Sequence, residues 1–183
     1  CVGQSLERVR VVGPSLLRSV DPPLSAVEGR RVLGMRRLGK RIVFAREEEL
    51  FLIFHLMLAG RFHWRERGTR PSRKTGLASL DFATGTLILT EASTQKRATL
   101  HLVRGEAALA EHDPGGLEVL EATPDAFRAR LRSENRTLKR ALTDPHIFSG
   151  IGNAYSDEIL HRARLSPVTL TSRLSDEECL HLY

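Results

Sequence analysis

The feature that most constrains the fold is a change of pattern near residue 113. Before Asp113-Pro114-Gly115-Gly116 the apolar residues form short runs of strand length, and after it they recur at helical spacing. A chain of 183 residues has room for one large domain or two small ones. The pattern predicts an α+β protein, with an antiparallel β-sandwich at residues 1–115 and a helical domain at residues 116–183.

Five stretches of the first part are typical of strands, at residues 5–12, 31–45, 50–64, 77–90 and 99–103. We expect residues 77–90 to form a hairpin that turns at Ala83-Thr84-Gly85, with residues 99–103 pairing next to it. In the first stretch, simple alternation places Leu6, Arg8 and Arg10 on one face, opposite Val9 and Val11. The polar, basic stretch 65–76 is expected to be an exposed loop.

The second part contains several helix signals. Helix starts are expected at Thr123-Pro124, at Asn135 or Thr137, near Ala154, and at the capping box Ser175–Glu178. The helix expected at residues 154–164 carries Tyr155, Ile159 and Ala163 at a spacing of four residues.

The distribution of charge favours an anionic partner. The net charge is +6, but residues 1–80 contain 16 Lys and Arg against 7 Asp and Glu, whereas residues 81–183 contain 12 against 15. A strongly cationic half suits a nucleic acid. Solubility alone is the plain alternative, and composition does not choose between the two.

Cysteine content and hydropathy restrict the cellular compartment that we expect for the chain. Cys1 and Cys179 are the only cysteines, which excludes a disulfide framework and a Cys-x-x-Cys zinc site, so we expect a reducing, cytoplasmic environment. The longest apolar run, Leu50–Gly60, is too short to cross a bilayer, and no secretory signal is visible, so no membrane partner is expected. The chain lacks an initiator Met, and we expect its N-terminus to be a fragment boundary or a processed end.

The most informative segment is TLKRALTDPHIFSGIGNAYSDEILHRARLSP, residues 137–167. A basic helix with Lys139 leads through a Gly-x-Gly-Asn turn into the start of another helix. Exposed backbone N–H groups at such a start favour anions. Asn153 is placed either to cap the second helix or to donate to a phosphate. An ordinary helical hairpin, in which the glycines relieve strain and Asn153 is only a cap, fits the spacing as well.

This segment resembles the helix–two-turn–helix of the formamidopyrimidine-DNA glycosylase and endonuclease VIII family. The matching residues are Lys139, Gly150, Gly152, Asn153, Tyr155, Glu158 and Pro167, with Ala154 in place of the family's usual Ile. The resemblance implies that Lys139 and Asn153 bind DNA phosphates that flank a lesion, and that Tyr155 belongs to the same DNA-binding motif.

The resemblance extends to the first part of the chain. The segment Arg36-Arg37-Leu38-Gly39-Lys40 is similar to the family's R-R-x-x-K segment, which implies that Lys40 reaches DNA near the lesion and supports lyase chemistry. Residues 54–60 resemble the family's x-H-L-G-M-S-G stretch. This implies that His55 lies near the DNA backbone and that Leu58 fills the gap left by a flipped base. Core packing is the alternative for Leu58 and for Met57, which replaces a glycine.

Residues 94–98 (TQKRA) fall where the family often has D-P-R-R-F, so Arg97 is expected opposite the orphaned base. The missing Asp-Pro pair and the missing aromatic ring point away from the branch that is specific for oxidised guanine.

The family's first residues and last domain have no counterpart in this sequence. Members begin with Pro-Glu, whose proline amine attacks the sugar C1′ and forms a Schiff base, and they end in a four-cysteine zinc finger. We therefore expect a fragment that is inactive alone, contains no cofactor or metal site, and belongs to a parent protein that holds zinc in its finger.

The resemblance implies a bifunctional DNA glycosylase and AP lyase of base-excision repair. Such an enzyme flips out an oxidised base, cleaves the N-glycosidic bond and then cuts the strand. We expect a cytoplasmic, nucleoid-associated monomer whose partner is damaged double-stranded DNA. The alternative is a non-enzymatic nucleic-acid binder, since some ribosomal proteins use a similar helical motif, but those lack the sandwich with Lys40. A small-molecule enzyme is a weaker rival, because no nucleotide loop or metal cluster is present.

Overall fold

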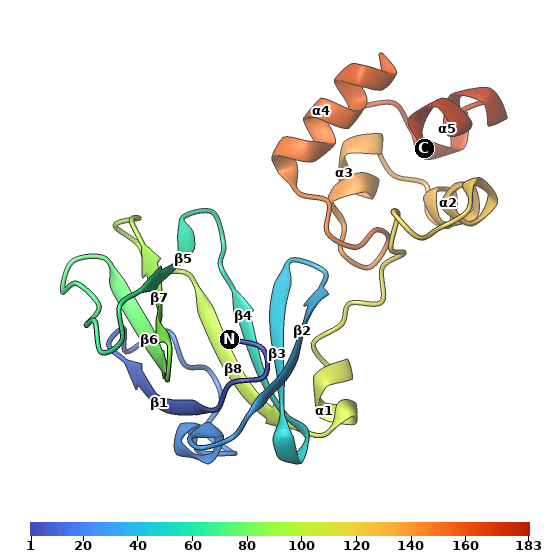
Figure 1. Ribbon diagram of the computed structural model, residues 1–183. Coiled ribbons are helices and arrows are strands. Elements are labelled where there is room, and N and C mark those ends of the chain that lie inside the picture. Colours follow the sequence, from blue (N-terminus) through green and yellow to red (C-terminus); the bar gives the residue numbers. More distant parts are fainter. The chain divides into compact units, whose positions relative to one another are not determined.

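The computed structural model describes all 183 residues, which form two compact units (Figure 1). The β unit contains Cys1–Arg37 and Arg41–His112, and the helical unit contains Leu38–Lys40 and Asp113–Tyr183. The α+β class is confirmed, with two antiparallel four-stranded sheets ahead of the main helices. The domain boundary after residue 115 stays a prediction. No helix is long and apolar enough to cross a membrane.

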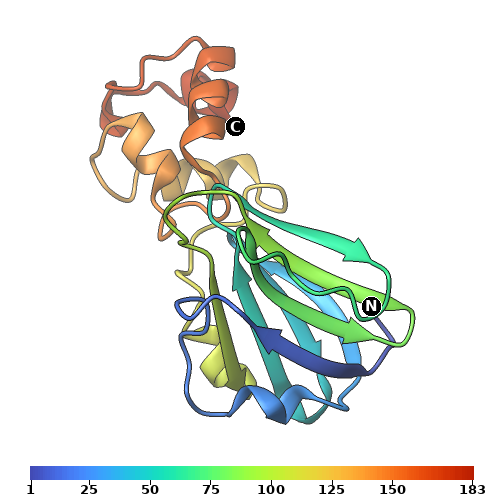
Figure 2. The same ribbon diagram turned by 90° about the vertical axis from the view of Figure 1, so that its left-hand side faces the viewer.

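The β unit is a sandwich of two sheets. One sheet has the order β1–β6–β7–β5, built from β1 (Leu6–Val11), β6 (Gly76–Phe82), β7 (Gly85–Glu91) and β5 (Gly60–Arg65). The other has the order β2–β3–β4–β8, built from β2 (Val32–Leu38), β3 (Arg41–Arg46), β4 (Leu50–His55) and β8 (Thr99–Arg104). Figure 2 shows β1, in dark blue, beside the green strands of its sheet. Residues 66–75 form the expected loop, which is mostly exposed and joins β5 to β6.

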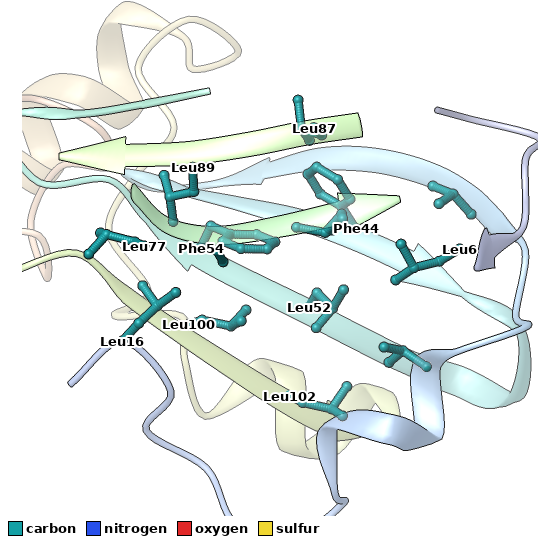
Figure 3. Close-up of a cluster of buried hydrophobic side chains, with 14 of the residues drawn as sticks. Leu6, Leu16, Phe44, Leu52, Phe54, Leu77, Leu87, Leu89, Leu100 and Leu102 are labelled. Atoms are coloured by element: carbon teal, nitrogen blue, oxygen red, sulfur yellow. The ribbon is translucent and has the colours of Figure 1, made fainter. Parts of the chain in front are cut away.

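The hydrophobic core fills the space between the two sheets (Figure 3). Leu52, Phe54, Leu100 and Leu102 from one sheet meet Leu77 and Leu89 from the other, and each is at most 2% exposed. The rings of Phe44 and Phe54 pack with centroids 5.3 Å apart. Burial of apolar area on this scale is the main force that holds the two sheets together.

Strand β8 pairs with β4, from Leu50 opposite Arg104 to His55 opposite Thr99. The expectation that residues 99–103 pair beside the 77–90 hairpin is therefore wrong. The reason is that the hairpin has no open edge. Strand β5 occupies the far side of β7, and β1 occupies the far side of β6.

The expected division of β1 into two faces is also wrong. Leu6, Val9 and Val11 all pack toward the core, and the pairing with β6 shifts register between Leu6 and Arg8. This irregularity is a β-bulge, in which one extra residue resets the alternation. Arg8 and Arg10 consequently lie on the opposite side from Leu6.

The β6–β7 hairpin is confirmed, and its turn contains only Ala83 and Thr84, because Phe82 pairs with Gly85. The ring of Trp64 on β5 stacks on Phe82 with centroids 5.8 Å apart. A Cβ atom on Gly85 would lie 2.6 Å from Trp64 Cε2, so only glycine allows the indole to lie this close to the turn.

The helical unit contains α2 (Pro124–Leu131), α3 (Leu138–Thr143), α4 (Asn153–Ala163) and α5 (Asp176–Leu182). The caps at Thr123 and Ser175 are confirmed. The Thr123 hydroxyl accepts a hydrogen bond from the Ala126 N–H, and Ser175 forms a complete capping box with Glu178. Thr137, and not Asn135, precedes α3, although its side chain makes no capping bond. A short helix in the β unit, α1 (Glu106–Ala110), was not expected from the sequence.

The buried face of α4 differs from the predicted one. Ser156, Leu160 and Ala163 are buried, whereas Tyr155 is 68% exposed. The spacing of four residues chosen from the sequence drifts around the helix, because two turns take 7.2 residues and not 8. Tyr155 is therefore free to meet a ligand.

Candidate nucleic-acid interface

In the helical unit, Lys139 and Asn153 are brought together by the packing of α3 against α4. Lys139 Nζ donates to the backbone oxygen of Asn153 at 2.9 Å and forms an ion pair with Asp157 Oδ1 at 2.5 Å. The Lys139 ammonium is thus fixed beside the first turn of α4.

The start of α4 is open to a ligand. Gly152 is the N-cap residue, its backbone is extended, and no side chain caps the helix. Asn153 is the first residue within the helix, so the interpretation of Asn153 as a cap is wrong. The N–H groups of the first turn have no intrahelical acceptor and carry the positive end of the helix dipole. Asn153 and Tyr155 are both exposed at this end of α4.

Lys40 lies at the same helix start. It follows Gly39 in the turn between β2 and β3, and this turn belongs to the helical unit. A Cβ atom on Gly152 would lie 3.5 Å from Lys40 Nζ, an ordinary van der Waals distance, so the ammonium lies against the backbone at the start of α4. Lys40 and Lys139 therefore flank the N-terminus of α4, with the Asp157 carboxylate as a counter-charge. We call Lys40, Lys139, Gly152 and Asn153 the α4 site.

The β unit contains a second group of predicted residues. Leu58, 92% exposed, lies at the tip of the loop between β4 and β5, next to Met57, whose φ is +55°. Arg97 lies in the loop between β7 and β8. The two loops line one hollow of about 190 Å³, to which Ala59, Glu91 and Gln95 also contribute. We call it the Leu58–Arg97 hollow. The core-packing alternative for Leu58 is excluded by its exposure.

Glu91 is a residue of this region that the sequence did not single out. Its side chain is buried, and its carboxylate accepts hydrogen bonds from the backbone N–H groups of Arg97 (2.9 Å) and Ala98 (3.1 Å). The Lys96 ammonium donates to the Glu91 carbonyl oxygen. Gln95 Oε1 accepts a 2.7 Å hydrogen bond from Arg97. Glu91 thus fixes the loop that carries Arg97. The only signal in the sequence was an acidic residue directly after the apolar run LILT.

His55 is placed differently from Leu58 and Arg97. It ends β4, half-buried between Arg41 and Thr99 of the neighbouring strands, and it does not line the hollow. Its assignment to DNA binding stays a prediction, as do the assignments of Lys40, Lys139, Asn153, Tyr155, Leu58 and Arg97. The structure contains no group of three or more His, Cys, Asp or Glu that could hold a metal ion.

Comparison with known families covers nearly the whole chain. Residues 1–104 match the formamidopyrimidine-DNA glycosylase N-terminal domain, and residues 116–183 match the formamidopyrimidine-DNA glycosylase H2TH domain. The chain belongs to the formamidopyrimidine-DNA glycosylase family. This membership confirms the resemblance of both parts of the sequence.

Individual formamidopyrimidine-DNA glycosylases are similar along the same stretch. The enzyme of Heliobacterium modesticaldum is 30% identical over 99% of this chain, and that of Mycoplasma genitalium is 29% identical over 97%. The chain spans 68% and 63% of these two relatives. A crystal structure of Lactococcus lactis Fpg in complex with DNA that contains an abasic site superposes with a TM-score of 0.86 at 25% identity. That match covers 99% of this chain and 68% of the Lactococcus chain.

Proposed function

We propose that this member of the formamidopyrimidine-DNA glycosylase family serves base-excision repair as a DNA glycosylase and AP lyase that binds damaged duplex DNA. The observation that carries the proposal is the α4 site, where two ammonium groups and an exposed asparagine lie beside a helix start that no side chain caps. Cations and unpaired helix N–H groups in this arrangement suit a backbone phosphate. The Lactococcus relative, bound to abasic DNA, supports the choice of ligand.

The Leu58–Arg97 hollow has the chemistry needed where a base leaves the stack. A fully exposed leucine is costly in water and is stabilised when it fills the void of an extruded base. The Arg97 guanidinium beside it is suited to donate hydrogen bonds to the unpaired opposite base.

DNA binding is tested by titrating a labelled duplex that contains an abasic-site analogue. Lys139→Ala and Asn153→Ala are each expected to weaken binding by about 1–3 kcal/mol, since each leaves a phosphate contact unmade. The control is Arg162→Ala, which removes an exposed cation of α4 about 13 Å along the helix from Asn153. Equal losses in all three variants, or no loss in the first two, would refute the α4 site.

The lyase step is tested by borohydride, which traps an imine between a protein amine and the C1′ atom of an abasic site. The family assigns this amine to an N-terminal proline, whereas these 183 residues begin with Cys1-Val2. We expect little adduct from this chain and much more when a Pro-Glu-Leu-Pro-Glu segment precedes Cys1. Lys40→Ala should lower the second yield. A non-enzymatic nucleic-acid binder would give no adduct in either form and would bind damaged and intact duplexes equally.

A further inference from the structure

A second cationic hollow lies elsewhere in the β unit. It has a volume of about 460 Å³ and is lined by the side chains of Arg8, Arg10, Arg67, Arg70, Glu7 and Asp81. We call it the arginine hollow. It shares no residue with the Leu58–Arg97 hollow.

The register of β5 and β7 shows how far apart the two hollows are. Gly60 pairs with Glu91 at the end that carries the Leu58–Arg97 hollow, and Arg65 pairs with Thr86 at the end that leads to Arg67. Five residue steps along a strand correspond to about 17 Å. A ligand in one hollow therefore does not occupy the other.

The floor of the arginine hollow is held by a hydrogen-bonded network. Asp81, 8% exposed, accepts hydrogen bonds from the Arg10 guanidinium and, at 2.8 Å, from the Thr86 hydroxyl. The Thr86 oxygen in turn accepts the Gly68 N–H at 2.9 Å, which ties the β5–β6 loop to the sheet. Arg67 donates to Glu7 at 2.7 Å. The loop is therefore fixed against the sheet, and two of the four arginines are neutralised.

The other two arginines carry the net charge of the hollow. Arg8 and Arg70 are exposed, and neither side chain has an acidic partner in the structure. The β1 bulge contributes to this arrangement, because it turns Arg8 away from the core. The adjoining segment 65–76 holds five cations and one carboxylate. The surface is thus a line of positive charge with two free guanidinium groups at a preformed concavity.

We propose that the arginine hollow binds the backbone phosphates of a nucleic-acid segment in addition to the one bound at the α4 site. A guanidinium offers two parallel N–H donors that match two phosphate oxygens. Cations spread along a loop suit a ligand whose charges repeat at a short, regular spacing, as those of a nucleic-acid strand do. An acidic protein segment offers fewer and less regular charges. The consequence is a chain that contacts two stretches of nucleic acid at once.

The test is a bridging experiment with the complete 183-residue chain. One duplex is immobilised, and a second, labelled duplex is captured only by protein that holds both. Arg8→Ala/Arg70→Ala is expected to abolish most of the capture. The second binding event can also be titrated directly at several salt concentrations. The slope of log affinity against log salt concentration should be smaller in magnitude by about two in the double variant, at roughly 0.9 per lost phosphate contact.

The matched control is Arg18→Ala/Arg31→Ala, which removes two exposed cations of the β unit outside the hollow and outside segment 65–76. The proposal requires the control to retain most of the capture, and equal loss in both pairs would overturn it in favour of diffuse attraction. Full capture by Arg8→Ala/Arg70→Ala would also overturn it.

A competition experiment identifies the class of ligand. If polyglutamate displaces the labelled duplex at a lower concentration than unlabelled duplex does, the proposal is overturned, because the arginine hollow then prefers an acidic protein segment.

The proposal for the α4 site and the proposal for the arginine hollow are refuted by different results. Lys139→Ala/Asn153→Ala removes the first binding event and leaves direct binding at the arginine hollow. Loss of capture in that variant with normal direct binding at the hollow supports both sites. Capture that is insensitive to Lys139 and Asn153 but sensitive to Arg8 and Arg70 would refute the α4 site alone.

Discussion

Glu91 offers a sharp test of how the Arg97 loop is held. Its carboxylate accepts backbone N–H bonds from Arg97 and Ala98, and the side chain is 1% exposed. Truncation in Glu91→Ala leaves both N–H groups without this acceptor, at about 1–3 kcal/mol for the buried Ala98 N–H and less for the part-buried N–H of Arg97. We expect a loss of about 2–5 kcal/mol in the free energy of unfolding of the β unit. Glu91→Gln keeps one acceptor oxygen and should lose about 1–2 kcal/mol.

Urea unfolding followed by circular dichroism gives the free energy of unfolding, and amide hydrogen exchange reports on the loop itself. The Arg97 and Ala98 amides should exchange much faster in Glu91→Ala, and binding of abasic DNA should weaken because Arg97 is no longer fixed. Glu66→Gln is the control, since this exposed carboxylate should change stability by less than about 0.5 kcal/mol. Wild-type stability together with wild-type exchange at Arg97 and Ala98 in Glu91→Ala would refute the reasoning.

Three further predictions concern the helical unit. Asp157→Asn should tighten duplex binding by up to about fivefold in an anisotropy titration, because it releases Lys139 from an exposed ion pair. Ser175→Ala should lower the free energy of unfolding by about 1 kcal/mol in urea, because it removes the cap of α5. A hydrogen bond from the backbone N–H of His146 holds the pKa of the Asp144 carboxyl below its usual value. The ionised carboxylate therefore stabilises the fold at any pH above the pKa of Asp144 in the unfolded chain. This stabilisation is lost as the pH falls through the lower pKa of Asp144 in the folded chain. Asp144→Asn should therefore be less stable near neutral pH and lose less stability between about pH 5 and pH 2, measured by thermal unfolding across that range.

The parts of the fold that depend on neighbouring residues were predictable from the sequence. The β6–β7 hairpin, the Thr123 cap and the Ser175 capping box each follow from a few adjacent side chains. The partner of β8 was not predictable, because it depends on which sheet edges other strands have already filled. The β1 bulge was missed for a similar reason, since alternation in one strand does not show an extra residue relative to its partner. Helix α1 has only five residues, too few to display a helical period.

In the candidate sites, too, features carried by adjacent residues were predictable, and features that depend on distant residues were not. The motif around Lys139 and Asn153 is contiguous, and the structure places Lys40, distant in sequence, beside them. Glu91 acts through backbone groups of a loop that follows it, a role that no residue pattern reveals. The arginine hollow combines β1 with a loop about sixty residues later, so only the folded chain brings Arg8 and Arg70 to one place.

The close approach of Trp64 to Gly85 gives the molecule a built-in optical reporter. Trp64 is the only tryptophan, it lies in the β unit, and its environment depends on the β6–β7 turn and the Phe82 ring. Both tyrosines, Tyr155 and Tyr183, belong to the helical unit. Indole emission excited at the red edge therefore follows the melting of the sandwich. The tyrosine absorbance, separated from the indole band by its second derivative, follows the helical unit through Tyr183, whose hydroxyl donates to the Ala122 carbonyl oxygen. The cooperativity between the two units can thus be measured in the unlabelled wild-type chain, by comparing the midpoints of the two signals.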